Sequence, residues 1–313
     1  MKRKWIWRSI GIVLALPLAL VLAAGIWYQL ADRSTGAVSV AGETREYLLH
    51  VPATYDPARA APLVISMHGT GLWPAAQAAM SGWNTVADEE GFIVAYPSAT
   101  PLTVFGWPKL WRAWEDISGD EATMADVRFI SILIDRLTAE YNIDPARVYA
   151  NGFSSGGAMA NRLACALGDR FVAMGTVATA HLSFDLCDDI HGMPLIAFHG
   201  TADTQVPYEG GTSVMSGDEP WDSVANWIRG WAERNGCDLS PRRTRVANDV
   251  ERVEYGGCAS GAGVVLYTVE GGGHTWPGSN PPGWMSGMAG STTNSVDATR
   301  EIWAFFEAQQ RSE

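Results

Sequence analysis

Residues 148–160, VYANGFSSGGAMA, place two adjacent serines between glycines. A β-branched run precedes the serines and an alanine-rich run follows them, which is typical of a strand that turns directly into a helix. Ser154 is the central residue of a G-x-S-x-G pattern at residues 152–156. Such a turn strains the central residue and exposes its side chain, and the flanking glycines leave room for it. Ser154 is therefore a candidate nucleophile, and Ser155 contributes its backbone N–H.

Short apolar runs alternate with helical patterns on both sides of this turn. We expect strands at residues 62–69, 91–98, 147–152, 171–180, 194–200 and 263–270, and helices at residues 124–141, 155–167, 222–235 and 296–309. This rhythm predicts an α/β fold with a mostly parallel central sheet and helices on both faces. Residues 37–52 read as an antiparallel hairpin at the sheet edge, with Ala41 and Gly42 near its turn.

The N-terminus has a different composition from the rest of the chain. Four cations within residues 1–8 precede an uncharged apolar run over residues 9–30. We therefore expect residues 1–31 to be a signal peptide or an N-terminal membrane anchor, and residues 32–313 to be a single catalytic domain outside the cytoplasm. Removing residues 1–31 takes away four positive charges and no negative ones, so the net charge changes from -12 to -16. Such an acidic domain is a poor partner for nucleic acid.

Four cysteines, an even number, fit an exported protein with two disulfides. Three pairings are possible. The sequential one, Cys165 with Cys187 and Cys237 with Cys258, closes two loops of about 20 residues, each worth roughly 3 kcal/mol. Free buried thiols are the alternative.

A serine nucleophile needs a base, usually a histidine oriented by a carboxylate, and in this fold the order along the chain is serine, acid, histidine. Of the six histidines, His274 alone lies well after the late strands, in EGGGHTWPG. The three preceding glycines are expected to give this loop the freedom to return the imidazole to the sheet edge. His274 is the predicted base.

Asp203 is the first candidate for the acid, because it directly follows the strand expected at residues 194–200. Glu209, Asp218 and Asp222 are alternatives that lie farther from the strand end.

Negative charge on a tetrahedral intermediate needs preorganised N–H donors. One normally comes from the residue after the nucleophile, here Ser155, and the other from the loop after an earlier strand. Thr70, between Gly69 and Gly71, occupies that second position. An ordinary β-turn would explain the two glycines equally well.

Several motifs together resemble the polyhydroxybutyrate depolymerase and feruloyl esterase-like α/β-hydrolases. They are HGTG at residues 68–71, NGFSSGG at 151–157, HGTADTQVPY at 199–208, GGGHTWPG at 271–278 and the NGC-to-GGC cysteine spacing. The likeness extends from about Thr44 to Phe306 and implies the α/β-hydrolase fold.

The resemblance also implies site residues: Ser154 as nucleophile, Asp203 as acid, His274 as base, and the residues Thr70 and Ser155 as the oxyanion hole. The family's paired aspartates before the long helix appear here as Ala125 and Asp126, which bears on loop packing rather than on the triad.

Tryptophans are candidate substrate-binding residues, because aromatic rings could line an acyl or sugar pocket. Trp107, Trp111 and Trp114 crowd one loop, and Trp276 lies beside the predicted base and is the first choice. A packing role is the alternative for each of them.

These features predict an exported serine esterase that hydrolyses carboxylic esters through an acyl-enzyme on Ser154. The resemblance points to 3-hydroxybutyrate oligomers or polyester; a feruloyl or acetyl esterase on plant-type glycans and a general carboxylesterase are alternatives. Acyl transfer to another alcohol would use the same residues. A catalytically inactive binding protein would lack a triad member, and none is lacking. No cofactor, metal, nucleic acid or protein partner is expected.

Overall fold

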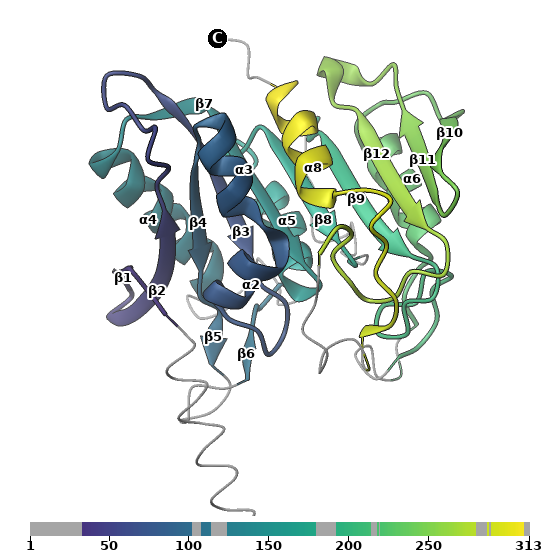
Figure 1. Ribbon diagram of the computed structural model, residues 1–313, viewed down its shortest axis with the longest axis horizontal. Coiled ribbons are helices and arrows are strands. Elements are labelled where there is room, and N and C mark those ends of the chain that lie inside the picture. The colour runs from purple at the N-terminus through teal and green to yellow at the C-terminus, as the bar shows by residue number, and fades with distance from the viewer. Residues whose placement is uncertain are drawn as a thin grey trace, which may run out of the picture.

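A ten-stranded sheet forms the centre of the computed structural model (Figure 1). The structure describes residues 33–101, 108–113, 124–179, 192–213, 218, 220–279, 287 and 289–309. In sheet order the strands are β1 (Gly36–Val40), β2 (Glu43–His50), β4 (Ile93–Pro97), β3 (Ala61–Met67), β7 (Ile143–Phe153), β8 (Ala173–Val177), β9 (Leu195–Gly200), β12 (Val264–Val269), β11 (Val250–Tyr255) and β10 (Arg242–Ala247).

The middle of the sheet is parallel and both of its edges are antiparallel. Strands β4, β3, β7, β8, β9 and β12 pair in parallel, so their carboxyl ends meet along one edge. The β1–β2 hairpin closes one side of the sheet, and the β10–β11 hairpin closes the other. A separate ribbon joins β5 (Thr100–Pro101) to β6 (Lys109–Leu110). The predicted α/β fold with a mostly parallel sheet is confirmed.

Helices cover both faces of this sheet (Figure 1). One face carries α2 (Pro74–Ser81), α3 (Trp83–Glu90) and α8 (Ala298–Glu307), and the other carries α4 (Ala125–Glu140), α5 (Ser155–Ala166) and α6 (Val224–Arg234). Helices α2 and α3 are not predicted from the sequence. Each has only 8 residues, and Gly82, at a φ of 69°, ends one and begins the other, so neither shows a long amphipathic period.

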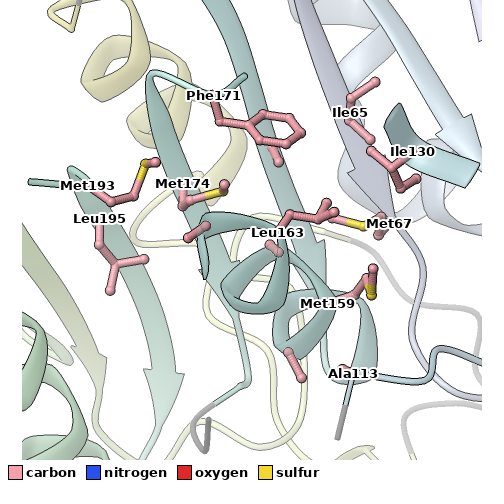
Figure 2. Close-up of a cluster of buried hydrophobic side chains, with 14 of the residues drawn as sticks. Ile65, Met67, Ala113, Ile130, Met159, Leu163, Phe171, Met174, Met193 and Leu195 are labelled. Carbon is pink, nitrogen blue, oxygen red and sulfur yellow. The ribbon is translucent and has the colours of Figure 1, made fainter. Parts of the chain in front are cut away.

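Two apolar cores result from the alternation of side chains along the strands. In β3, Leu63, Ile65 and Met67 belong to the core under α4 and α5, whereas Val64 belongs to the core under α3 and α8. Figure 2 shows the first core, where Leu163 and Met159 of α5 lie among side chains from the sheet. The sheet is therefore held from both sides, and the ends of its strands are fixed in place.

The N-terminal hairpin turns where the sequence predicts. Ala41 and Gly42 have φ values of 50° and 86°, the pair of positive angles that a two-residue hairpin turn requires. Residues 1–31, the predicted signal peptide or anchor, lie outside the described residues. Within the described ranges, no helix combines the length and the apolar character that crossing a bilayer would require.

The β10–β11 hairpin is the main strand pair that is not predicted. Strand β10 reads RRTRVA and is almost fully exposed, so it lacks an apolar alternation. Its arginines pair with acids instead: Arg243 bonds Glu251 at 2.8 Å and Arg245 bonds Glu270 at 2.7 Å. Cross-strand charge pairing replaces the hydrophobic signal along this edge.

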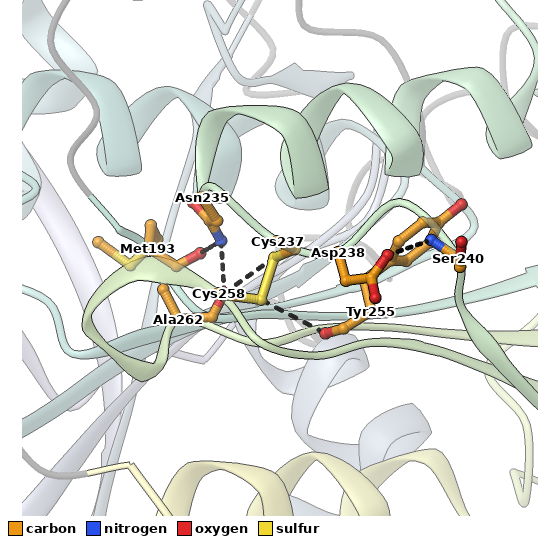
Figure 3. Close-up of a disulfide and its surroundings, with 8 residues drawn as sticks. All are labelled: Met193, Asn235, Cys237, Asp238, Ser240, Tyr255, Cys258 and Ala262. Atoms are coloured by element: carbon orange, nitrogen blue, oxygen red, sulfur yellow. Dashed lines mark hydrogen bonds between the residues drawn. A yellow bond between two sulfur atoms is a disulfide. The ribbon is translucent and has the colours of Figure 1, made fainter.

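A disulfide joins Cys237, just after α6, to Cys258, which follows β11 (Figure 3). Next to it, the Asn235 side-chain amide donates to the carbonyls of Met193 at 2.7 Å and Ala262 at 2.8 Å. These carbonyls directly precede β9 and β12, so the disulfide lies at the amino edge of the sheet.

One half of the sequential pairing is therefore observed. Cys165 is also disulfide-bonded, and Cys187 lies outside the described residues.

Replacing both Cys237 and Cys258 by serine should lower the free energy of unfolding by about 3 kcal/mol, because the bond spans 21 residues of the unfolded chain. Chemical denaturation of the folded variant measures this change. The esterase activity that the sequence predicts should not change per folded molecule, since the bond lies at the edge opposite the strand carboxyl ends. A loss below about 1 kcal/mol would contradict the expectation.

Candidate active site

Ser154 lies at the sharp turn between β7 and α5. Its backbone angles are φ 52° and ψ −121°, a strained combination for a residue with a side chain. The Ser154 N–H donates to the Val177 carbonyl at 2.9 Å, and its own carbonyl accepts from Gly157 at 2.9 Å and Ala158 at 3.1 Å. The strained conformation is thus held by the neighbouring strand on one side and by the helix on the other.

The two glycines of the G-x-S-x-G pattern are required because neighbouring main-chain segments approach them too closely to leave room for a Cβ. A Cβ on Gly152 would lie 2.2 Å from the Gly156 carbonyl carbon, and a Cβ on Gly156 would lie 2.3 Å from the Met67 carbonyl oxygen. The first contact brings α5 against β7, and the second brings α5 against the end of β3.

Asp203 and His274 form a buried pair at the carboxyl ends of β9 and β12. The His274 Nδ1–H donates to Asp203 Oδ2 at 2.7 Å. The other oxygen, Oδ1, accepts the N–H groups of Gln205 at 2.8 Å and Val206 at 2.9 Å. The turn after β9 therefore holds the carboxylate, which in turn fixes the tautomer of the imidazole and leaves Nε2 free to accept a proton.

The electrostatics of the pair favour an ionised carboxylate. Burial alone would raise the pKa of Asp203, but hydrogen bonds from His199 and His274 outweigh it and hold that pKa well below its usual range. An anion that stays charged beside the imidazole stabilises the protonated ring.

Gly272 and Gly273 before His274 serve close packing, whereas Gly271 uses the backbone freedom expected of the glycines in this loop. A Cβ on Gly273 would lie 2.1 Å from the Ala289 carbonyl oxygen, and one on Gly200 would lie 2.2 Å from the Gly272 oxygen. Gly271 has a φ of 70°. The two loops also share a hydrogen bond of 2.8 Å from the Ala202 N–H to the Gly272 carbonyl. The loop is locked against the Asp203 turn.

Ring and backbone contacts bring three loops together around the serine. The Phe153 ring lies 4.9 Å from the His274 imidazole, centroid to centroid. A Cβ on Gly69 would lie 3.2 Å from the Ser154 Cβ, so the loop after β3 passes directly over the turn. Ser154, His274 and Thr70 thus lie on loops that follow three parallel strands at one edge of the sheet, and Phe153 contacts both of the other loops.

The backbone N–H groups of Thr70 and Ser155 donate none of the backbone hydrogen bonds found in the described loops and helix caps. Ser155 is the first residue of α5, where a helix leaves its N–H groups without partners. The Ser155 hydroxyl is buried with no hydrogen-bond partner among the described residues, so it packs and does not cap the helix. Both amides suit an anionic oxygen.

His199 is a residue that the motif order does not single out. Its Nε2–H donates to the Val206 carbonyl at 2.8 Å and lies 3.4 Å from Asp203 Oδ2. The sequence feature that could have identified His199 is its place in the HGTAD motif, four residues before Asp203.

The alternative acids and Asp126 lie elsewhere. Asp222 accepts from Ser223 and Asn226 at the exposed start of α6, and Glu209 and Asp218 are exposed. Asp126 makes a buried ion pair with Arg45 at 2.6 Å and accepts the Arg112 N–H at 2.8 Å. It ties the loop before α4 to β2, which explains its role in packing.

Of the four candidate tryptophans, two are buried packing residues and two lie outside the described residues. Trp276 is 1% exposed and its indole N–H donates to Thr299 Oγ1 at 2.9 Å, so it offers no free surface to a substrate. Trp111 is fully buried and donates to the His68 carbonyl at 2.8 Å. Trp107 and Trp114 lie outside the described residues.

Comparison with known proteins agrees with this geometry. Residues 45–188 match the family described as "Esterase PHB depolymerase". NocK of Nocardia uniformis subsp. tsuyamanensis, whose name classes it as an esterase, is 34% identical over 85% of this chain and 80% of its own length. Feruloyl esterase B of Piromyces equi is 32% identical over 77% of this chain, which spans 44% of that relative.

Among solved structures, the acetyl xylan esterase from Aspergillus awamori shares the fold, with a TM-score of 0.53 at 18% identity over 78% of this chain and 92% of its own. The relative from Nocardia is matched over most of both chains, and Ser154 falls inside the residues that the family model matches. The chain belongs to the polyhydroxybutyrate depolymerase and feruloyl esterase-like family of α/β-hydrolases.

Proposed function

We propose that this chain is a serine esterase that hydrolyses carboxylic esters through an acyl-enzyme on Ser154. The observation that carries the proposal is the buried 2.7 Å hydrogen bond between His274 and Asp203, at the same carboxyl edge of the sheet as the strained turn of Ser154. Family membership supports ester hydrolysis as the reaction class.

The Ser154 Oγ attacks the ester carbonyl carbon while His274 Nε2 takes the hydroxyl proton. The carbonyl oxygen becomes an oxyanion that accepts from the Thr70 and Ser155 N–H groups. Collapse of this intermediate breaks the bond to the alcohol, which leaves with the proton from His274. A water then attacks the acyl-enzyme, His274 takes the water's proton and returns it to Ser154, and the carboxylic acid is released.

Asp203 acts through His274 in this scheme. It holds Nδ1–H so that Nε2 faces the serine, and its negative charge stabilises the imidazolium that forms at each step. Its low pKa keeps it ionised throughout the cycle.

For the substrate, we propose hydroxycinnamoyl esters of plant-type glycans first and 3-hydroxybutyrate oligomers second. Relatives from Piromyces equi and Emericella nidulans are named feruloyl esterases, which supports the first class. The family's description supports the second.

We also propose that the enzyme works outside the cytoplasm. The Cys237–Cys258 disulfide supports an oxidising compartment, and the basic and apolar residues 1–31 supply an export signal or anchor.

Ser154→Ala should abolish labelling by a fluorophosphonate probe and reduce kcat by about 10⁴-fold or more, because the attacking oxygen is lost. Asp203→Asn should reduce kcat by about 10⁴-fold while the protein still folds. Intact-protein mass spectrometry and p-nitrophenyl ester kinetics measure both effects. Asp222→Asn, at an exposed cap, is the matched control and should keep wild-type rates. Probe labelling that survives Ser154→Ala would contradict the proposal.

Asp203 should also make stability depend on pH. Folding lowers its pKa, so the ionised carboxylate contributes stability above its unfolded pKa of about 4, and this contribution is lost as the pH falls below that value. Between pH 6 and pH 2 the wild type should lose on the order of 2 kcal/mol more unfolding free energy than Asp203→Asn. Denaturation curves at each pH measure the difference, and parallel curves for the two proteins would contradict it.

A substrate panel tests the proposed ester classes. Methyl ferulate and feruloylated oligosaccharides should be cleaved with a higher kcat/KM than acetylated xylan, hydroxybutyrate trimers or short p-nitrophenyl esters. Chromatography of the released acids measures each rate. Cleavage of the p-nitrophenyl esters alone would replace the substrate proposal with a general carboxylesterase.

A further inference from the structure

The carbonyl groups behind the two oxyanion amides are held by side chains. A trans peptide group is planar, and its C=O and N–H point in opposite directions. The Thr70 N–H therefore shares a plane with the Gly69 carbonyl, and the Ser155 N–H shares one with the Ser154 carbonyl. Any group that fixes one of these carbonyls also sets the direction of the amide on the other side.

The Gly69 carbonyl is fixed by the side chain of His68. The His68 Nδ1–H donates to it at 2.8 Å, and the Leu72 N–H adds a second bond at 3.1 Å. The His68 Nε2 accepts the Ala99 N–H at 3.1 Å, so the ring has a single neutral tautomer. Burial lowers the pKa of His68 to about 3, which keeps this arrangement intact across the working pH range.

Trp111 holds the start of the same loop. Its indole N–H donates to the His68 carbonyl at 2.8 Å, and its ring lies 5.5 Å from the His68 ring. Two residues earlier, the Lys109 carbonyl accepts the Gly71 N–H at 2.9 Å. The segment from Lys109 to Trp111 thus forms hydrogen bonds with the loop on both sides of Thr70.

Thr179 holds the carbonyl on the other side of the site. Its hydroxyl donates to the Ser154 carbonyl, which also accepts the N–H groups of Gly157 and Ala158. Thr179 follows Ala178, whose φ is 53° and whose N–H donates to the Phe198 carbonyl at 2.8 Å. Gly157 makes room for this threonine, because a Cβ there would lie 2.6 Å from the Thr179 Oγ1. The strained residue Ala178 therefore places the Thr179 hydroxyl against the Ser154 carbonyl, on the side of the peptide group opposite the Ser155 N–H.

We propose that Trp111 and Thr179 are positioning residues of the oxyanion hole: Trp111 holds the backbone of His68, whose ring fixes the Gly69 carbonyl behind the Thr70 N–H, and Thr179 helps to fix the Ser154 carbonyl behind the Ser155 N–H. This proposal rests on the proposed esterase function. It gives Trp111 a role in aiming an amide in place of the expected contact with substrate.

Loss of either positioning residue should weaken transition-state binding and leave substrate binding unchanged. An oxyanion donor is worth most when its N–H points at the developing charge, and the ground-state ester gains little from it. The expected signature is a lower kcat with the same KM.

Thr179→Val removes the hydroxyl at nearly constant shape and should lower kcat by about 10-fold. Thr179→Ser retains the hydroxyl and should keep kcat within about twofold of wild type. The matched control is Thr176→Val on β8, because the Thr176 hydroxyl is buried without a partner in the described part of the chain. This control should also keep the wild-type kcat.

Trp111→Phe removes the indole N–H and should likewise lower kcat by about 10-fold with unchanged KM. Replacing Trp111 by 3-benzothienylalanine, which has the same shape but no N–H, serves as the second variant if the phenylalanine variant folds poorly. Trp303→Phe is the matched control, because Trp303 is buried and its N–H has no partner among the described residues.

Two further measurements complete the test. In the positioning variants, affinity for a trifluoromethyl ketone analogue should fall in proportion to kcat/KM, and fluorophosphonate should still label Ser154 fully but more slowly. Equal rates in variants and matched controls, a raised KM with unchanged kcat, or a Thr179→Ser variant as slow as Thr179→Val would overturn the proposal. Absence of any wild-type labelling would instead refute the esterase function itself.

Discussion

The active-site edge of this protein depends on backbone segments that approach more closely than side chains would permit. At Gly152, Gly156, Gly200 and Gly273, an added Cβ would lie 2.1 to 2.3 Å from a main-chain atom. The contacts at Gly152, Gly156 and Gly200 join a strand end to the loop or helix beside it, and the contact at Gly273 joins the His274 loop to Ala289. Because these loops carry the serine, the acid and the histidine, their spacing is set by contact between main chains, which leaves little room for adjustment.

The sheet supplies the rigidity that such contacts need. Side chains of β3 alternate between two apolar cores. Helix α5, which directly follows the Ser154 turn, packs on one of them (Figure 2). The strained residues Ser154 and Ala178 lie at the ends of adjacent strands, β7 and β8. Strain at two neighbouring strand ends is maintained because the strands themselves cannot shift.

The predictable parts of the structure were those with a strong local pattern. The parallel strands, the helix after Ser154 and the turn at Ala41 and Gly42 all follow from periodicity and turn chemistry. Strand β10 could not be predicted, because it has no apolar alternation. Its exposed arginines pair with acids elsewhere in the chain, and the local sequence does not show those pairs. In the site, the order of motifs was enough to select Asp203 and His274, which the structure brings into contact. The roles of Trp111 and Thr179 depend on which carbonyl each side chain meets, and no spacing in the sequence specifies that.

The charged edge strand β10 also affects how the molecule behaves in solution. An uncovered strand normally invites another chain to extend the sheet, and the three arginines along β10, which pair with glutamates outside it, oppose such growth. At high ionic strength these pairs are screened. Colloidal stability of the folded protein is thus linked to salt through an exposed edge strand that carries none of the candidate active-site residues.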